Sequence, residues 1–251
     1  GYGTPTQEMV ESYEYAKGGL PNWTEWHGTT TKTPPYADLE PRFHATILYN
    51  GAKWKSRLIE PFVGGVDGWC QWNIDREPMG RTTTGYYLRK LVDEEHDVIA
   101  YSGGVQPLII MRYAEVLLNK AEACYHLDQS ADANAAVKKI RERVDLPYTD
   151  KGGSALWDAI RQERKVELAF EGLWYWDLRR WGVAHKQYPE GLTGYQQHGL
   201  KIENNGDGTF TYTYVSVDDQ DRNFPEKMYR FPMPSGELNN NALVEQYDEW
   251  K

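Results

Sequence analysis

Residues 107–182 decide the fold of this chain, and they read PLIIMRYAEVLLNKAEACYHLDQSADANAAVKKIRERVDLPYTDKGGSALWDAIRQERKVELAFEGLWYWDLRRWG. Apolar residues first recur with the 3.6-residue period of an amphipathic helix, at Ile110, Ala114, Leu117, Leu118, Ala121, Cys124 and Tyr125. A second run with this period spans residues 133–144 and stops before Pro147. Ser154 is expected to cap a third helix that ends near Phe170. We therefore predict an αα-hairpin of tetratricopeptide-repeat length, and because one pair cannot bury its own apolar face well, we expect it to cap another part of the protein.

Composition excludes several classes of protein. The chain has 251 residues and a net charge of -9, and its Lys and Arg residues form no basic stripe, which argues against nucleic acid as a partner. It has no run of 18 apolar residues, so no membrane-spanning helix is predicted. Cys124 lies on the apolar helix face and is predicted to be a buried free thiol, not a disulfide partner of Cys70.

The rest of the chain is predicted to be loop-rich. The expected elements are a helix over residues 5–17, a strand over 42–49 with residues 53–62 returning antiparallel, a β-hairpin over 199–217, and a short helix over 235–245. Two long irregular stretches, residues 20–41 and 63–85, separate these elements. Because no linker divides the chain, we predict a single domain over residues 1–251, mainly α with long loops and a β-hairpin.

Three carboxylates on the third helix raise the question of catalysis. Glu163, Glu167 and Glu171 are four residues apart and so share one helix face, whereas the two carboxylates of a glycosidase approach the substrate from opposite sides. Counter-charges are available nearby, at Arg161, Arg164, Lys165, Arg179 and Arg180. We interpret the carboxylates as an ion-pair network that ties the third helix to the segment after it, not as a catalytic pair.

Other catalytic and ligand-binding motifs are absent from the sequence. The six histidines form no HxH or HxxxH pair, and no nucleophile elbow, P-loop or dinucleotide-binding motif occurs. The acidic loop residues lack the spacing of an EF-hand and are interpreted as solvated loops. We therefore predict no catalytic residues, no metal site and no cofactor.

Loop aromatics are the candidate binding residues. Trp23, Trp26, Trp69 and Trp72 lie in the two irregular stretches with few aliphatic neighbours, and exposed loop aromatics are enriched at binding surfaces. We predict that these four residues stack on the C–H faces of sugars. The other tryptophans near the helical centre are interpreted as packing residues, namely Trp157, Trp174, Trp176 and Trp181.

Five segments carry a resemblance to a known family. They read PTQEMVESYE (5–14), EPRFHATILYNG (40–51), MRYAEVLLNKAEA (111–123), IRQERKVELAFEGLWYWDLRRWG (160–182) and MYRFPMPSGELNNNALVEQ (228–246). In this order they resemble the C-terminal half of the SusD/RagB family of outer-membrane nutrient-binding lipoproteins of Bacteroidetes. Three departures are small: Glu40 stands where Asp is common, Met233 replaces an Ile, and the tail QYDEW differs from the usual ending.

The resemblance implies a function that the motifs do not. It implies a SusD-like α fold and a protein that is lipid-anchored on the extracellular face of the outer membrane, through a lipid anchor outside this chain. Such a protein binds oligo- or polysaccharides without catalysis and delivers them to a SusC-like TonB-dependent transporter. Its conserved-motif positions, Arg161, Glu163, Arg164, Glu167, Phe170, Glu171, Trp176, Asp177 and Arg179, carry over as structural residues. Two alternatives stay open: capture of peptides or another nutrient, and a transporter-docking scaffold with no ligand site in this half.

Overall fold

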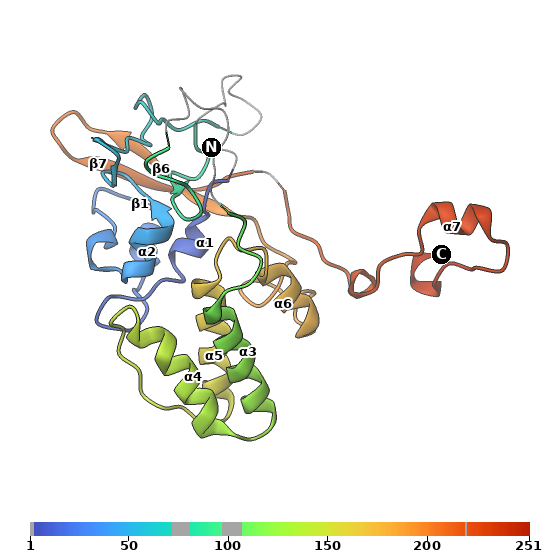
Figure 1. The fold of residues 1–251 in the computed structure, drawn as a ribbon. Coiled ribbons are helices and arrows are strands. Elements are labelled where there is room, and N and C mark those ends of the chain that lie inside the picture. Colours follow the sequence, from blue (N-terminus) through green and yellow to red (C-terminus); the bar gives the residue numbers. More distant parts are fainter. Residues whose placement is uncertain (1–2, 72–80, 97–106, 219) are drawn as a thin grey trace. The chain divides into compact units, whose positions relative to one another are not determined.

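The computed structural model describes residues 3–71, 81–96, 107–218 and 220–251 (Figure 1). Its helices are α1 (Gln7–Val10), α2 (Pro41–Thr46), α3 (Tyr113–His126), α4 (Ser130–Glu142), α5 (Gly153–Glu167), α6 (Trp174–Arg180) and α7 (Ser235–Asn240). Its strands are β1 (Thr29–Thr30), β2 (Ile47–Leu48), β3 (Lys53–Trp54), β4 (Arg57–Leu58), β5 (Tyr87–Leu88), β6 (His198–Asn204) and β7 (Phe210–Ser216). The predicted fold class, mainly α with long loops and a β-hairpin, is confirmed.

The chain forms two compact units. The first consists of residues 1–171 with 197–218, and the second of residues 172–196 with 219–251. The chain therefore passes from the first unit to the second, returns to the first unit, and ends in the second. No change in composition marks these crossings in the sequence, and the single domain over residues 1–251 stays a prediction.

Helices α3, α4 and α5 pack side by side in the first unit, and α3 and α4 form the predicted αα-hairpin (Figure 1). The α3–α4 turn places Asp128 in the left-handed region at φ 57°, which Asp tolerates better than most residues. Helix α5 begins at Gly153, so the prediction that Ser154 is its cap is wrong. The helices bury small and branched side chains between them: Ala121, Cys124, Ala133, Ala136, Val137, Leu156 and Ile160. Cys124 is a buried free thiol, as predicted.

The N-terminal segment departs from the predicted elements in two places. Helix α1 has one turn instead of spanning residues 5–17, because the Ser12 hydroxyl donates to the Glu8 carbonyl and Tyr13 turns into the core. The strand predicted over residues 42–49 is mostly helix α2, which starts with Pro41 at its favoured first position and gives way to strand only at Ile47. Phe43 and Ile47 are four residues apart and are both buried in the same core. This is the spacing of one helix face, and it differs from the two-residue spacing of a strand face.

Within the described residues the strands form three sheets, and long strands occur in the sheet of β1, β7 and β6. The predicted hairpin is confirmed as β6 and β7, whose turn uses Gly206 and Gly208 at positive φ, and β1 adds to β7 as an outer strand. The predicted antiparallel return of residues 53–62 onto 42–49 is wrong. Instead β2 pairs with β5, and β3 pairs with β4 in a hairpin of its own.

Aromatic side chains dominate the core between this sheet and the helices. Its buried members are Val10, Tyr13, Trp23, Trp26, Tyr36, Leu39, Phe43, Ile47, Tyr86, Val166, Leu200, Ile202 and Tyr212. Buried hydroxyls need partners, and Tyr86 donates to Gln7 Oε1 at 2.6 Å while its oxygen lies 2.8 Å from the Tyr36 hydroxyl.

The carboxylates of α5 form a buried ion-pair network. Glu163 accepts from Arg42 and from Arg141, whose Nη1 lies 3.1 Å from Oε2. Glu167 is 2% exposed and accepts from Arg112 at 2.6 Å, Arg143 at 2.8 Å and Arg42 at 3.1 Å. The network holds equal numbers of acidic and basic side chains: Glu14, Glu40, Glu163, Glu167, Glu171, Arg42, Lys90, Arg112, Arg141 and Arg143.

This network joins α5 to segments that precede it in the chain. Arg42 comes from α2, Arg141 from α4, Arg112 from the start of α3, and Lys90 from the end of β5. The predicted network is thus confirmed, and its tie to the segment after α5 stays a prediction. Burial by itself would raise the pKa of Glu167; the hydrogen bond from Arg112 and the charges of Arg143 and Arg42 outweigh it and hold that pKa below its ordinary value.

The second unit is organised around Arg179 of α6. Its guanidinium donates to the carbonyls of Met228 and Tyr229 and stacks 4.4 Å from the centre of the Phe231 ring. Nearby, an apolar cluster buries Leu178, Val183, Ala184 and Phe224, and Trp174 and Trp181 pack against it. Residues 228–234 form no strand, in keeping with Pro232 and Pro234, which lack the N–H that a strand ladder needs.

An exposed apolar run leads into α3. Leu108, Ile110 and Met111 are 88%, 89% and 63% exposed, and Tyr113 and Val116 continue the run along the helix. Contiguous apolar surface of this kind is uncommon on soluble monomers and mediates association.

Replacing Glu163 by Gln should destabilise the first unit strongly. The change leaves Arg42 and Arg141 with one counter-charge fewer in a buried site, and breaking one partner of such a pair costs about 3–5 kcal/mol of unfolding free energy. Urea unfolding followed by tryptophan fluorescence measures it. The matched control is Asp158→Asn on the same helix, whose pair with Arg161 is exposed on the Asp side and is expected to contribute less than about 1 kcal/mol. Equal losses for the two variants would contradict the buried network.

The apolar run at the start of α3 should make this chain self-associate. We expect the weight-average sedimentation coefficient to rise with protein concentration, and Leu108→Lys/Ile110→Lys to remove that rise. Leu243→Lys is the control, because Leu243 is 94% exposed and lies in the other unit. A wild-type chain that sediments as a monomer at all concentrations would refute the prediction.

Candidate functional site

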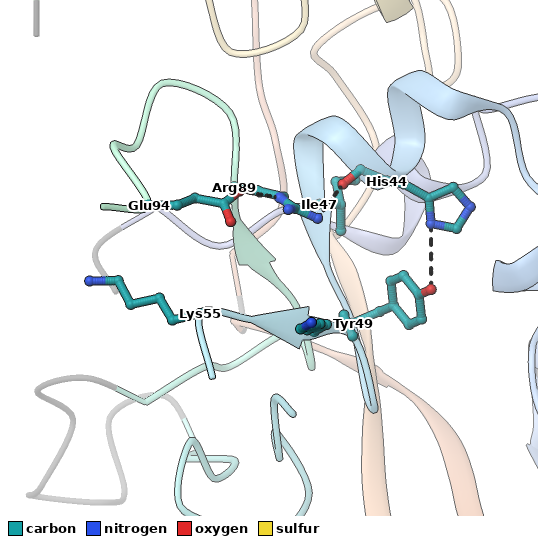
Figure 2. A pocket seen from close by; sticks show the side chains of 8 residues that line it. His44, Ile47, Tyr49, Lys55, Arg89 and Glu94 are labelled. Atoms are coloured by element: carbon teal, nitrogen blue, oxygen red, sulfur yellow. Dashed lines mark hydrogen bonds and ion pairs between the residues drawn. The ribbon is translucent and has the colours of Figure 1, made fainter. Parts of the chain in front are cut away.

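A surface pocket of about 450 Å³ lies in the first unit, beside α2 and the short strands (Figure 2). Its volume falls in the range of small-ligand sites. The lining residues are His44, Ile47, Tyr49, Ala52, Lys53, Lys55, Arg89 and Glu94, and we call it the Arg89 pocket. Figure 2 shows Lys55 and Glu94 on one side of it and the His44 and Tyr49 rings on the other.

The β3–β4 hairpin places two lysines on one face of the pocket. Lys53 lies in β3 and Lys55 in the turn that follows it, and both line the pocket, while Trp54 between them packs with an apolar cluster. Trp54 pairs with Arg57, which leaves Lys55 and Ser56 as a two-residue turn. Lys55 has φ 53°, and its Nζ donates to the carbonyl of His96 at 2.7 Å.

Arg89 forms a fixed wall of the pocket. Its backbone N–H donates to the Thr46 carbonyl at 2.8 Å, which extends the β2–β5 pairing by one residue. Its side chain is held twice, by Nε to Glu94 Oε1 at 2.5 Å and by Nη1 to the His44 carbonyl at 3.2 Å. Its Nη2 has no hydrogen-bond partner within the described part of the chain, so one side of the guanidinium is available to a ligand.

The opposite end of the pocket is aromatic and uncharged at neutral pH. Burial lowers the pKa of His44, and the charge of Arg89 lowers it too, against a backbone hydrogen bond to Leu39 that raises it. The His44 Nδ1 lies 3.4 Å from the Tyr49 hydroxyl, and burial raises the pKa of that hydroxyl. The Tyr49 ring rests on Tyr36 and Phe43 with ring centres 4.5 Å and 5.3 Å away, which connects the pocket to the core.

Positive charge exceeds negative charge in the lining. Lys53 and Lys55 have no carboxylate partner among the residues described, and Glu94, the one acidic lining residue, is paired with Arg89. This is a local reversal on a chain whose net charge is -9. The pocket thus offers hydrogen-bond donors, positive charge and a flat aromatic wall, which can hold a polar ligand.

The predicted stacking residues lie elsewhere. Trp23 and Trp26 are each only 5% exposed and pack edge to face in the aromatic core, so the expectation that they are exposed loop residues is wrong. The loop that carries them folds inward because Trp26 Nε1 donates to the Lys32 carbonyl at 2.9 Å and both rings find aromatic neighbours. Trp69 is half-buried, and Trp72 lies outside the described residues. Stacking of these four residues on sugars stays a prediction.

Sequence reasoning also missed exposed residues. Trp176 was interpreted as a packing residue, but it is 52% exposed and contacts Phe231 only at the ring edge.

The Arg89 pocket was not predicted from the sequence. Its one local signal is the alternation Lys53-Trp54-Lys55, whereas Arg89 reaches the pocket through a strand pairing that no sequence pattern announces.

Comparison with known proteins identifies the family. The sequence profile of the SusD family matches residues 1–250. This chain belongs to the SusD family. The chain is 40% identical over 87 residues to SusD-like protein P38 of Formosa agariphila, a match that covers 31% of this chain and 17% of that protein. SusD-like protein P2 of the same organism is 38% identical over 95 residues, which cover 34% and 19%.

Solved structures confirm the SusD-like fold. A SusD-like protein from Bacteroides fragilis superposes with a TM-score of 0.79 at 26% identity, over 97% of this chain and 46% of that chain. A second protein from Bacteroides fragilis, described as a SusD-like carbohydrate-binding protein, gives 0.70 at 24% identity over 96% and 48%. The chain therefore spans about half the length of these solved relatives.

Replacing Trp26 by Ala should destabilise the protein, because the side chain fills the core. Removing a buried aromatic costs about 3–5 kcal/mol. Trp176→Ala, which removes a half-exposed side chain of the same type, is the control and should cost far less. Chemical unfolding monitored by circular dichroism compares them. If Trp26→Ala left stability intact, its place in the core would be wrong.

Proposed function

We propose that this SusD-family chain binds oligo- or polysaccharide at the cell surface, without catalysis, and delivers it to a SusC-like TonB-dependent transporter. The observation that carries the proposal is the match of the SusD family over residues 1–250, together with the pocket in the same chain. It gains support from the solved relative described as carbohydrate-binding, whose fold this chain shares.

A binding role agrees with the state of the carboxylates. The pair that hydrolysis of a glycoside requires has its best candidates in Glu163 and Glu167, and both side chains are 2% exposed and held by guanidinium groups. A substrate therefore has no access to them in this structure. The Arg89 pocket presents cations and aromatic rings instead, and these hold a ligand without breaking it.

The proposed location is the extracellular face of the outer membrane. Attachment there would come through a lipid anchor outside this chain. Among the residues described, none of the helices combines the length and the apolarity needed to span a bilayer.

A transporter-docking scaffold is the second candidate, and one observation favours it. The exposed run Leu108–Met111 is an apolar surface of the kind that protein partners cover. Capture of peptides instead of glycans is the remaining alternative, and the experiment below separates it from the proposal.

Tryptophan fluorescence tests the proposed function directly. We expect titration with a panel of plant, host and microbial oligosaccharides to give a saturable change with one glycan class, and Trp69→Ala/Trp72→Ala to weaken it by about tenfold or more, since aromatic stacking contributes about 1–3 kcal/mol. Trp176→Ala in the other unit is the control and should bind as the wild type does. Peptides of mixed sequence form a second panel. Saturable binding of peptides with silence across every glycan would overturn the proposal in favour of peptide capture.

A further inference from the structure

We propose that the Arg89 pocket binds an anionic group, a carboxylate or a sulfate ester, on the sugar ligand, so that the glycan class is acidic. This inference rests on the proposed function, glycan binding, and goes further by naming the chemistry of the ligand. It is drawn from the charges, the fixed geometry and the two unlike ends of the pocket.

The first step concerns charge. Lys53, Lys55 and Arg89 converge on one cavity, and the described residues offer them a single carboxylate, Glu94. Elsewhere in the first unit, half-buried cations such as Lys90 and Arg112 are matched by Glu167 and Glu171. An exposed lysine without a partner is common, but cations gathered around a cavity repel one another unless an anion enters. The lining therefore favours a negatively charged ligand group.

The second step concerns preorganisation. Arg89 is anchored through Nε and Nη1, so its guanidinium plane is set before a ligand arrives. A guanidinium binds carboxylates and sulfates through charge-assisted N–H donors, and fixing it in advance removes the entropic cost of ordering a long side chain. Its Nη2 is the donor left for the ligand within the part of the chain that the structure describes. The adjacent lysines Lys53 and Lys55 add positive charge to the same lining.

The third step concerns Lys55. It occupies the left-handed backbone region at φ 53° in a two-residue turn, a place that glycine or asparagine takes at lower cost. A lysine there projects its ammonium from the tip of the β3–β4 hairpin towards the pocket, where Nζ is held at the His96 carbonyl. Asparagine would fit the same backbone without the charge, which makes Lys55→Asn a clean probe.

The two ends of the pocket orient the ligand. The acidic group is placed at the Lys53, Lys55 and Arg89 end. The uncharged part of the sugar lies at the other end, where Tyr49 offers a ring and a hydroxyl and neutral His44 offers a ring nitrogen. Glu94 is the opposing charge, and its pairing with Arg89 limits its repulsion of the ligand. The pocket thus discriminates between an acidic sugar and its neutral form.

Isothermal titration calorimetry with matched ligands tests this inference on the full chain. The ligand pairs are trigalacturonic acid with its methyl ester, and a sulfated galactan oligosaccharide with its desulfated form. We expect the wild type to prefer the acidic member of at least one pair, with an affinity that falls as sodium chloride is raised. Lys53→Gln/Lys55→Asn should lower the affinity for the acidic member by about tenfold or more and leave the neutral member unchanged. The two pairs tell a carboxylate from a sulfate.

The charge-matched control is Lys120→Gln/Lys138→Gln. It removes two exposed lysines of α3 and α4 whose acidic partners lie at 3.9 Å and 3.8 Å, and it should bind as the wild type does. Equal affinity of wild type for acidic and neutral members, or equal losses in both double variants, would overturn the pocket inference while glycan binding stands. Silence towards all four oligosaccharides, with or without binding of a glutamate-rich peptide, would overturn it together with the proposed glycan function.

Discussion

The structure of the first unit depends on the burial of Glu163 and Glu167. Each carboxylate would be costly to bury alone, and each is satisfied by guanidinium groups that arrive from α2, α3 and α4. Because one helix face must meet cations from several distant segments at once, the network tolerates few alternative arrangements. It fixes α5 against the αα-hairpin on one side and against α2 on the other, and α2 leads directly into the strands beside the pocket.

The ion-pair network also bears on where charged side chains remain available to a ligand. Charges inside the network are matched one against another, and the carboxylates of Glu163 and Glu167 are closed to solvent and to substrates. Three cations outside the network, Lys53, Lys55 and Arg89, line the pocket beside α2 and the short strands. A rigid interior built on ion pairs therefore supports a surface pocket whose charges are available. This division separates the structural role of the carboxylates on α5 from the binding role that we propose for the Arg89 pocket.

Aromatic residues divide in a similar way. Trp23, Trp26, Tyr36 and Tyr86 fill the core, where their rings pack and most of their polar atoms find partners. Tyr49 lies at the boundary, because one face of its ring rests on the core while its hydroxyl reaches the pocket. The position of a tryptophan in a loop thus says little about its exposure, since a loop of many residues closes over the core as readily as it extends from it.

Sequence alone determined those features that depend on neighbours in the chain. The periodic runs of α3, α4 and α5, the Gly-rich turn between β6 and β7, the buried Cys124, and the family motif were all predictable, because period and turn chemistry are local. Tertiary structure decided the rest. Four features depend on contacts between residues distant in sequence: whether residues 42–49 form helix or strand, which cations neutralise α5, whether Trp26 is buried, and whether Arg89 and Lys53 line one pocket. Those contacts exist only once burial of the whole core makes up for the entropy of bringing the segments together.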